Sequence, residues 1–370
     1  MTSGDSLATA RLVAATTEEI IDAAPATEGF AEAAWQSLCA AGLHLIGVAE
    51  DRGGAGGSWP EARSALAASA RRAVPIPLAE VLFGVAPALA GLPMDPSDHG
   101  CLTSSTFAAR SALRARPSGS GWQLDGVASR VPFARHAASL VVVAATTGNA
   151  SVLARIRASG PGMHLKPGIN VADEPRDDVR LVECEVSADQ AAVITTERAA
   201  ELRRLAALAR SLQIAAACDR VVSMTVRYAG ERRQFGRPIS RFQAVAHQIA
   251  AMVGETTVLN AGVDAAISSL GTSAEEVAVA AVKSRAAQAA TMVARSAHQV
   301  FGALGFTQEH PLHRITGRLW SWRHEAGRSE EWQRDLGGTA LAVGAGSLWP
   351  LLSGTLTAGA AASGAVTTAD

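Results

Sequence analysis

The chain has 370 residues, of which 48% are hydrophobic, and its formal net charge is -1. This length is enough for two or three domains, since domains commonly contain about 100–200 residues. A nearly neutral chain lacks the basic field typical of nucleic-acid-binding proteins, so we expect no nucleic-acid partner.

The sequence also lacks signs of export or membrane insertion. The four cysteines, Cys39, Cys101, Cys184 and Cys218, are far apart and form no CxxC pair, which is typical of reduced thiols. Residues 1–5 carry no basic patch, and no apolar run approaches the ~20 residues that a membrane span needs. We therefore expect a cytoplasmic protein without a membrane partner.

Residues 1–97 are predicted to form an N-terminal α-helical domain. The pattern Thr16-Thr17-Glu18-Glu19 is typical of a capping box and predicts the start of a helix there. Three further helices are predicted, over about residues 30–43, 60–72 and 79–89. The segment 91–100 contains glycines and two prolines, which indicates a domain boundary.

Residues 98–195 are predicted to form a small middle β-domain, a barrel or sheet. Runs or alternations of apolar residues have the length of strands, and glycines and prolines separate them. The predicted strands cover residues 122–127, 140–144, 152–156 and 179–184.

Residues 196–352 are predicted to form a C-terminal antiparallel four-helix bundle. Ser273-Ala274-Glu275-Glu276 resembles a capping box, and small residues then recur every four positions from Ala278 to Ala294, which favours close helix packing. The predicted helices cover about residues 205–226, 242–263, 273–301, 312–326 and 330–343. The Gly-Ala-Thr-rich segment 353–370 is predicted to be a disordered tail. The predicted fold class is therefore α+β and multidomain.

A basic turn joins the first two long helices of this bundle. It reads Arg232-Arg233-Gln234-Phe235-Gly236, and Phe242-Gln243 follows. A guanidinium group such as that of Arg232 suits paired phosphate oxygens, but it also suits the C-terminus of a helix. Phe235 could likewise contact a ligand, but the spacing alone favours a place in the core.

Three motifs together resemble acyl-CoA dehydrogenases. The first is the turn above with its Phe242-Gln243. The second runs from Trp35 to Gly57 and contains Glu50-Asp51-Arg52-Gly53-Gly54, with Ala49 where the family usually has proline. The third is Gln299-Val300-Phe301-Gly302-Ala303-Leu304-Gly305-Phe306, with Ala303 in place of a second glycine. The order helices, β-domain, helical bundle is also the order of that family.

The resemblance implies an FAD-dependent enzyme that acts on an acyl-CoA thioester. In such enzymes the α-proton is abstracted and a β-hydride passes to the flavin, giving an enoyl-CoA. By the same resemblance, Arg232 is implied to bind the FAD pyrophosphate and Phe235 the adenine end, while Gln299 and Gly302 supply contacts from a neighbouring subunit. A homo- or heteromeric dimer or tetramer and an electron-transfer flavoprotein are implied as partners.

Departures from the family pattern concern the catalytic site. The usual Thr-Glu-Pro-x-x-Gly-Ser loop of the β-domain is not matched at Leu102–Thr106, and the usual Tyr-Glu-Gly-Thr-Ser-Gln segment is absent. The family's other glutamate position falls near Leu205–Ala207, which contains no acid. The chain thus resembles a divergent actinobacterial-type branch, some of whose members work as unequal partners in mixed tetramers.

Glu325 is the candidate catalytic base. When Gly305-Phe306 is aligned with the matching loop of the family, Glu325 lies within one position of the glutamate in the Tyr-Glu-Gly-Thr-Ser-Gln segment. Gly327 then lies where that segment has its glycine. An apolar pocket walled by Trp320 and Trp322 would raise the pKa of the carboxyl group toward a range useful for proton abstraction. The alternative is a surface acid paired with a neighbouring arginine.

No metal site is expected. His310 and His313 are spaced like zinc ligands, but Pro311 stands between them and no third distant ligand is evident, which favours a polar turn.

Taken with the resemblance, the sequence predicts an FAD-dependent acyl-CoA dehydrogenase. Two alternatives stay open: a non-catalytic, FAD-sharing subunit of a heteromeric dehydrogenase, and a helical scaffold that has lost FAD.

Overall fold

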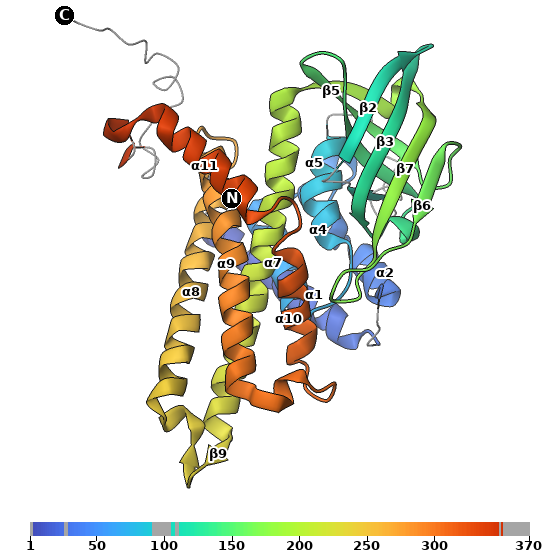
Figure 1. The fold of residues 1–370 in the computed structure, drawn as a ribbon. Helices are drawn as coiled ribbons and strands as arrows, with labels where there is room; N and C mark the ends of the chain where they lie inside the picture. Colours follow the sequence, from blue (N-terminus) through green and yellow to red (C-terminus); the bar gives the residue numbers. More distant parts are fainter. Residues whose placement is uncertain (1–2, 26–28, 91–104, 108–110, 348, 351–370) are drawn as a thin grey trace, which may run out of the picture.

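The computed structural model describes residues 3–25, 29–90, 105–107, 111–347 and 349–350. Within them, N-terminal helices are followed by a sheet and then by long helices, which confirms the predicted α+β multidomain fold class. Figure 1 shows the sheet beside one end of the long helices. The predicted boundary at 91–100 and the predicted tail at 353–370 lie outside the described residues.

The N-terminal region is helical, as predicted, but one predicted helix start is wrong. Its helices are α1 (Ser3–Ala23), α2 (Glu32–Ala40), α3 (Trp59–Arg72), α4 (Leu78–Glu80) and α5 (Ala86–Leu89), with the π-helical turn η3 (Val81–Val85) between the last two. Helix α1 runs through Thr16–Glu19, and the Thr17 hydroxyl donates to the Val13 carbonyl inside it (2.7 Å). A capping box lies instead at the start of α3, where the Glu61 carboxylate accepts hydrogen bonds from the Ser58 N–H (2.9 Å) and hydroxyl (2.6 Å).

The described strands of the middle region form one eight-stranded sheet. They are β1 (Ser105–Phe107), β2 (Ser111–Ser118), β3 (Gly121–Pro132), β4 (Ser139–Ala145), β5 (Ala150–Arg157), β6 (Met163–Lys166), β7 (Arg176–Val186) and β8 (Ala191–Thr195). Their order is β6-β7-β3-β2-β4-β5-β8, and β1 pairs with β4 in parallel. The four predicted strands correspond to β3, β4, β5 and β7.

The C-terminal region contains the predicted long helices. They are α7 (Thr196–Glu231), α8 (Gln243–Ser268), α9 (Glu275–Phe301), α10 (Leu312–Trp322) and α11 (Ser329–Val343), and a small hairpin of β9 (Arg233–Gln234) and β10 (Arg237–Pro238) joins α7 to α8. The predicted cap at Ser273 is wrong, because α9 begins after Ala274 without a side-chain cap. The Glu275 carboxylate instead accepts a hydrogen bond from the Gly271 N–H (2.9 Å) and pairs with Arg204 (2.7 Å).

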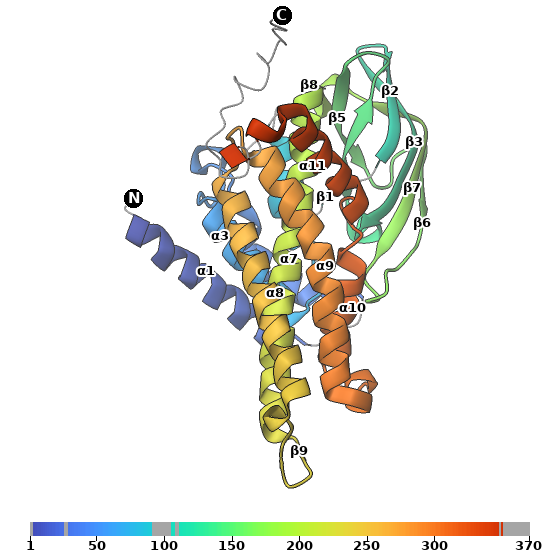
Figure 2. The same ribbon diagram turned by 60° about the vertical axis from the view of Figure 1, so that its left-hand side comes forward.

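Small residues let these helices approach closely, as the spacing along α9 predicts. Ala286, Ala290 and Ala294 are buried, and a Cβ atom at Gly262 of α8 would lie 3.2 Å from the Val282 side chain of α9. Figure 2 shows α7, α8 and α9 running side by side. The bundle is thus held by dense contact between short side chains rather than by large aromatic residues.

Two apolar cores hold the molecule together. The larger core is shared by the N-terminal helices and the bundle, and Val141 and Leu153 of the sheet reach into it. The smaller core lies within the sheet region and includes Leu124, Leu140 and Leu181. The sheet therefore packs on a helical body whose two parts share one core, and sites can form where sheet and helices meet.

None of the described helices combines the length and the apolar character needed to cross a membrane.

Cys39, Cys184 and Cys218 carry free thiols, and Cys101 lies outside the described residues. Burial raises the pKa of the Cys218 thiol, so we expect this group to stay protonated at neutral pH.

Candidate active site and cofactor surface

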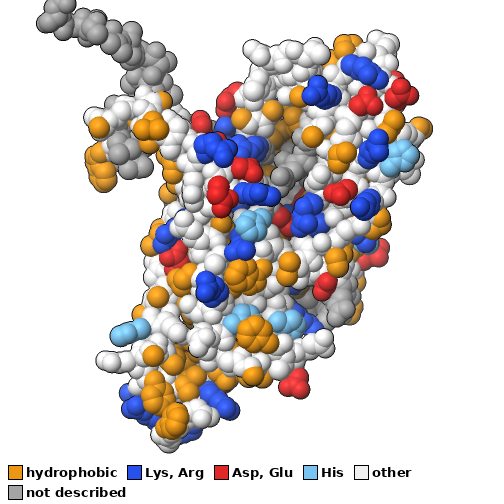
Figure 3. All heavy atoms as spheres, viewed as in Figure 1, with side chains coloured by type: hydrophobic (Ala, Val, Ile, Leu, Met, Phe, Trp, Pro, Cys, Tyr) orange, Lys and Arg blue, Asp and Glu red, His pale blue; other side chains and the backbone are white. Residues whose placement is uncertain are grey.

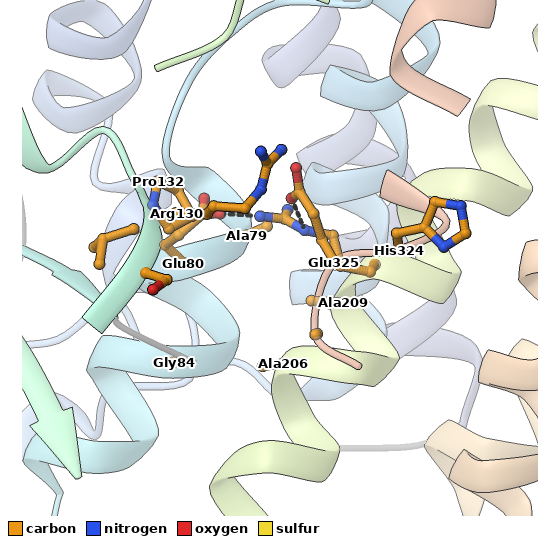
Figure 4. A pocket seen from close by; sticks show the side chains of 13 residues that line it. Ala79, Glu80, Gly84, Arg130, Pro132, Ala206, Ala209, His324 and Glu325 are labelled. Carbon is orange, nitrogen blue, oxygen red and sulfur yellow. Dashed lines mark hydrogen bonds and ion pairs between the residues drawn. The ribbon is translucent and has the colours of Figure 1, made fainter. Parts of the chain in front are cut away.

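A pocket lies where the sheet, the N-terminal helices and the bundle meet (Figure 4). The end of β3, the α4–η3 segment, α7 and the turn after α10 each provide a wall, with Ala79, Glu80, Gly84, Ser129, Arg130, Val131, Pro132, Ala206, Ala209, Arg210, His324, Glu325 and Ala326. Its volume is about 60 Å³, well below the ~300–1,000 Å³ of typical small-molecule sites.

The wall formed by α7 carries no acid where it faces the pocket. Ala206 and Ala209 line the pocket there, and the next charged residue, Arg210, is buried. This agrees with the absence of an acid from Leu205–Ala207 in the sequence. A base in this pocket must therefore come from another element.

Glu325 does reach the pocket, from a tight turn that follows α10. Ala326 and Gly327 take left-handed backbone conformations (φ 53° and 100°), and the Trp332 indole donates a hydrogen bond to the Ala326 carbonyl (3.0 Å). A Cβ atom at residue 327 would clash with the Trp332 Nε1 atom. Glycine at this position therefore lets the turn fold back and bring Glu325 to the pocket.

The Glu325 carboxylate is occupied by two arginines. Its Oε1 lies 2.8 Å from the Arg176 Nε, and its Oε2 lies 2.9 Å from the Arg210 Nε and 3.1 Å from the Arg176 Nη2. Figure 4 shows Glu325 pointing toward the pocket with an ion pair at its carboxylate. Burial alone would raise the pKa of Glu325, but the two guanidinium groups outweigh burial and lower it to about 2.

The predicted surroundings of Glu325 are therefore wrong in two respects. The pKa of the carboxyl group is lowered and not raised, because charged groups and not apolar walls surround it. The two tryptophans also serve other contacts: the Trp322 indole donates to Glu174 (3.0 Å), and the Arg323 guanidinium stacks on Trp320 (4.2 Å). The alternative of an exposed acid is wrong too, since the Glu325 side chain is only 11% exposed.

Glu174 extends this buried ionic network into the sheet, and sequence reasoning missed it. It precedes β7 and accepts hydrogen bonds from Asn170 (2.8 Å), Arg176 (2.9 Å), Arg318 (3.0 Å) and Trp322. Burial opposes its charge, but the arginines outweigh burial and lower the pKa of the carboxyl group. No local pattern marks Glu174, because its partners lie up to 148 positions away in the chain.

Arg210 connects the network to the N-terminal helices. Its guanidinium is buried and pairs with Glu80 of α4 as well as with Glu325. This face of α7 is covered by α4 and by the turn after α10. The network thus joins the sheet, α4, α7 and α10.

Lys283 of α9 contacts the end of α10, next to the turn that carries Glu325. It is fully buried, and its ammonium group donates to the Arg323 carbonyl at the end of α10 (3.0 Å). A cation at this place also suits the negative end of the helix dipole. Burial lowers the pKa of Lys283 to about 8, although the nearby Glu325 opposes this shift.

The residues predicted to contact FAD lie elsewhere, at the far end of the bundle. Arg232 is the C-cap residue of α7, and Phe235 and Gly236 form the two-residue turn between β9 and β10, both with positive φ (52° and 81°). Phe235 is 91% exposed, so its alternative place in the core is wrong. Figure 3 shows hydrophobic and basic side chains together at the tip that Figure 1 labels β9.

Gln299 and Gly302 lie at the same end of the bundle as this hairpin. Both are exposed, and Gly302 ends α9 with φ 61°. The ring of Tyr228, four residues before Arg232, stacks on Phe301 at 4.3 Å, which brings the ends of α7 and α9 together. The four predicted cofactor residues therefore share one surface, which is separate from the pocket around Glu325.

This surface suits a dinucleotide phosphate in its chemistry. Arg232 and Arg241 are exposed and have no ion-pair partner among the described residues, so their donors are available to an anion. Phe235 offers an aromatic face to solvent, and no side chain lies within 4 Å of a Cβ atom placed at Gly302. These features fit a phosphate, an aromatic ring and a close backbone approach.

His310 and His313 do not converge on one point. The His313 Nδ1 atom lies 2.8 Å from the His310 carbonyl, and the His310 Nδ1 atom accepts a hydrogen bond from the Leu312 N–H (3.2 Å). Across the described parts of the chain, no group of three His, Cys, Asp or Glu side chains is placed to hold a metal ion.

Comparison with known proteins agrees with the three motifs. The family model of the acyl-CoA dehydrogenase C-terminal domain matches residues 188–341. The chain is 31% identical over 230 residues to acyl-CoA dehydrogenase FadE28 of Mycobacterium tuberculosis, and this alignment covers 58% of the chain and 65% of FadE28. It is 30% identical over 288 residues to acyl-CoA dehydrogenase IpdE2 of the same organism, over 77% of the chain and 79% of that relative.

The fold has solved counterparts as well. A chain of the ChsE4-ChsE5 complex from Mycobacterium tuberculosis superimposes with a TM-score of 0.85 and 23% identity, over 93% of this chain and 99% of that chain. Helices, sheet and helical bundle thus have the architecture of the acyl-CoA dehydrogenase fold. The chain belongs to the acyl-CoA dehydrogenase family.

Proposed function

We propose that this chain is an FAD-sharing subunit of a heteromeric acyl-CoA dehydrogenase, in which an unlike partner chain supplies the catalytic base. The observation that carries this proposal is the pairing of Glu325 with both Arg176 and Arg210. A carboxylate with a pKa of about 2 is a weak base at neutral pH, whereas proton abstraction is most efficient when the pKa lies near the working pH. The other carboxylate in the pocket, Glu80, is also paired with Arg210.

The structural neighbour from Mycobacterium tuberculosis is a complex of two components, ChsE4 and ChsE5, which supports an assembly of unlike chains. The size of the pocket also supports a non-catalytic role for this chain. A volume of about 60 Å³ leaves little room for an acyl chain beside a flavin ring. The family acts on acyl-CoA thioesters, and we extend that substrate class, with an electron-transfer flavoprotein as electron acceptor, to the assembly.

FAD would be held at the exposed end of the bundle. We propose that the Arg232 guanidinium binds the pyrophosphate, that the Phe235 ring packs on the adenine end, and that Gln299 and Gly302 add a polar and a close backbone contact. Bound FAD supplies the acceptor for the hydride that leaves the β-carbon. Because these residues lie at the far end of the bundle from the pocket of their own chain, we propose that they serve a flavin held mainly by the partner subunit.

One observation favours the second candidate, in which this chain is itself the dehydrogenase. Glu325 lines the pocket together with His324, so a rearrangement that released it from both arginines would expose a carboxylate at the right place. The third candidate, a scaffold without FAD, is disfavoured by the exposed ring of Phe235 and by Arg232 and Arg241, which have no ion-pair partner among the described residues.

The experiment uses the purified chain, saturated with FAD and mixed with acyl-CoA thioesters of different length under anaerobic conditions. We expect little flavin bound for each chain and no bleaching of flavin absorbance. Bleaching by the chain alone that is lost in Glu325→Gln but kept in Glu309→Gln, an exposed acid outside the pocket, would overturn the proposal and favour the second candidate. Failure to bind FAD in every assembly, including co-purified partners, would favour the scaffold.

A further inference from the structure

The pocket holds one charged side chain that the ionic network does not use. Arg130 lies on β3 near its end, is exposed, and lines the pocket. Among the described residues its guanidinium has no ion pair or hydrogen bond, whereas Glu80, Arg210 and Glu325 are paired with one another. Figure 4 shows Arg130 reaching the pocket from β3, while Glu325 reaches it from the turn after α10.

The backbone at Arg130 is strained in a way that directs this side chain. Its φ is 54°, in the left-handed region that non-glycine residues seldom adopt. The pairing of β3 with β7 is irregular between Ala128 and Val131, and the Arg130 N–H donates to the Asp178 carboxylate (2.9 Å). Such bulges re-aim side chains beside functional sites, and the strain costs of order 1–3 kcal/mol that surrounding contacts must offset.

The charge around the pocket favours an anion. The carboxylates of Glu80, Glu174 and Glu325 are balanced by the guanidinium groups of Arg176, Arg210 and Arg318. Arg130 and the nearby Lys283 add two positive charges to this neutral set, and the Asp178 carboxylate beside the Arg130 N–H adds one negative charge, so the sum stays positive. The rest of the α7 wall is apolar, because Ala206 and Ala209 face the pocket.

We propose that Arg130 makes this pocket a binding site for the terminal carboxylate or phosphate group of a small ligand. The guanidinium fork suits the paired oxygens of either group, and a short apolar part of the ligand would lie against Ala206 and Ala209. This inference does not depend on which subunit carries the catalytic base, because Arg130 belongs to neither the ionic network nor the FAD surface.

The test titrates the full chain with inorganic phosphate and, separately, with glutarate, at constant low ionic strength and with calorimetric detection. We expect binding of at least one probe, and the preferred probe identifies the head group. Arg130→Gln should weaken that binding at least tenfold, Arg130→Lys should weaken it less, and added salt should weaken it further. Arg157→Gln is the matched control, since Arg157 is exposed on β5 and has no side-chain partner among the described residues.

Arg130→Gly separates binding from folding. Glycine adopts a positive φ without strain, so this variant should be at least as stable as the wild type in thermal unfolding and should still lose the anion. Two results would overturn the proposal: no binding of either probe by the wild-type protein, or equal binding by the wild type and by both Arg130→Gln and Arg130→Gly.

Discussion

Replacing Glu325 with glutamine should destabilise the protein, and the sign of this effect separates two views of the residue. A buried carboxyl group in an apolar pocket is costly, so its neutral isostere is often neutral or stabilising. A carboxylate held by Arg176 and Arg210 behaves in the opposite way, because its loss leaves two buried guanidinium groups short of one partner charge.

The structure sets the size of the effect. The fall in the pKa of Glu325 from its ordinary value of 4.5 to about 2 corresponds to about 3 kcal/mol, at about 1.4 kcal/mol for each tenfold change in proton affinity. This lies at the lower end of the ~3–5 kcal/mol measured when one partner of a buried pair is removed. Because the pKa is lowered on folding, this stabilisation is present above pH 4.5 and is lost as the pH falls toward 2.

The assay is urea unfolding followed by tryptophan fluorescence at pH 7 and at several acidic pH values. We expect the midpoint for Glu325→Gln to fall at pH 7, and the gap from the wild type to close as the pH approaches 2. Glu309→Gln, at an exposed acid outside the network, should unfold like the wild type at pH 7. If Glu325→Gln proved as stable as the wild type at pH 7, the ion pairs of Glu325 with Arg176 and Arg210 would not stabilise the folded protein, and this prediction would be contradicted.

Two further predictions concern the support of the Glu325 turn. Because burial lowers the pKa of Lys283 from 10.5 to about 8, the stability of the wild type relative to Lys283→Met should rise by about 3 kcal/mol between pH 8 and pH 10.5, measured by urea unfolding. Gly327→Ala should destabilise by ~2–4 kcal/mol in thermal unfolding, because the new methyl group clashes with the buried Trp332 indole. The matched change Gly338→Ala, in α11 with open space around it, should be neutral or stabilise by up to ~1 kcal/mol.

Local sequence pattern was enough to predict most helices and strands, and its errors have a common cause. Thr16–Glu19 and Ser273–Glu276 both match a capping box, yet the first lies inside α1, and the second begins two residues before α9, which has no side-chain cap. A capping pattern is only a local preference, and apolar contacts on either side of it decide where a helix begins. The capping box at Ser58–Glu61 is used, because an extended, glycine-rich segment precedes it.

The site was harder to predict than the fold, because its chemistry depends on distant partners. The sequence pointed to the position of Glu325, and the structure brings that residue to a pocket. It did not point to Arg176 and Arg210, which lie 149 and 115 positions before Glu325 and come together only through the packing of β7 and α7. The pKa of a carboxyl group depends on such partners, so the expected rise in the pKa of Glu325 was wrong.

The ionic network also limits what Glu325 can do in this chain. A base that works near pH 7 would need a pKa about 5 above the value that Arg176 and Arg210 impose, which corresponds to about 7 kcal/mol. That amount is comparable to the whole stability of a typical domain, so thermal fluctuation alone would seldom free the carboxylate. A ligand could free it only by drawing both arginines away, and Arg176 is also fixed by Glu174, just as Arg210 is by Glu80. The contacts that bind the sheet to the helices thus oppose the release of Glu325, and this supports our proposal that a partner chain supplies the base.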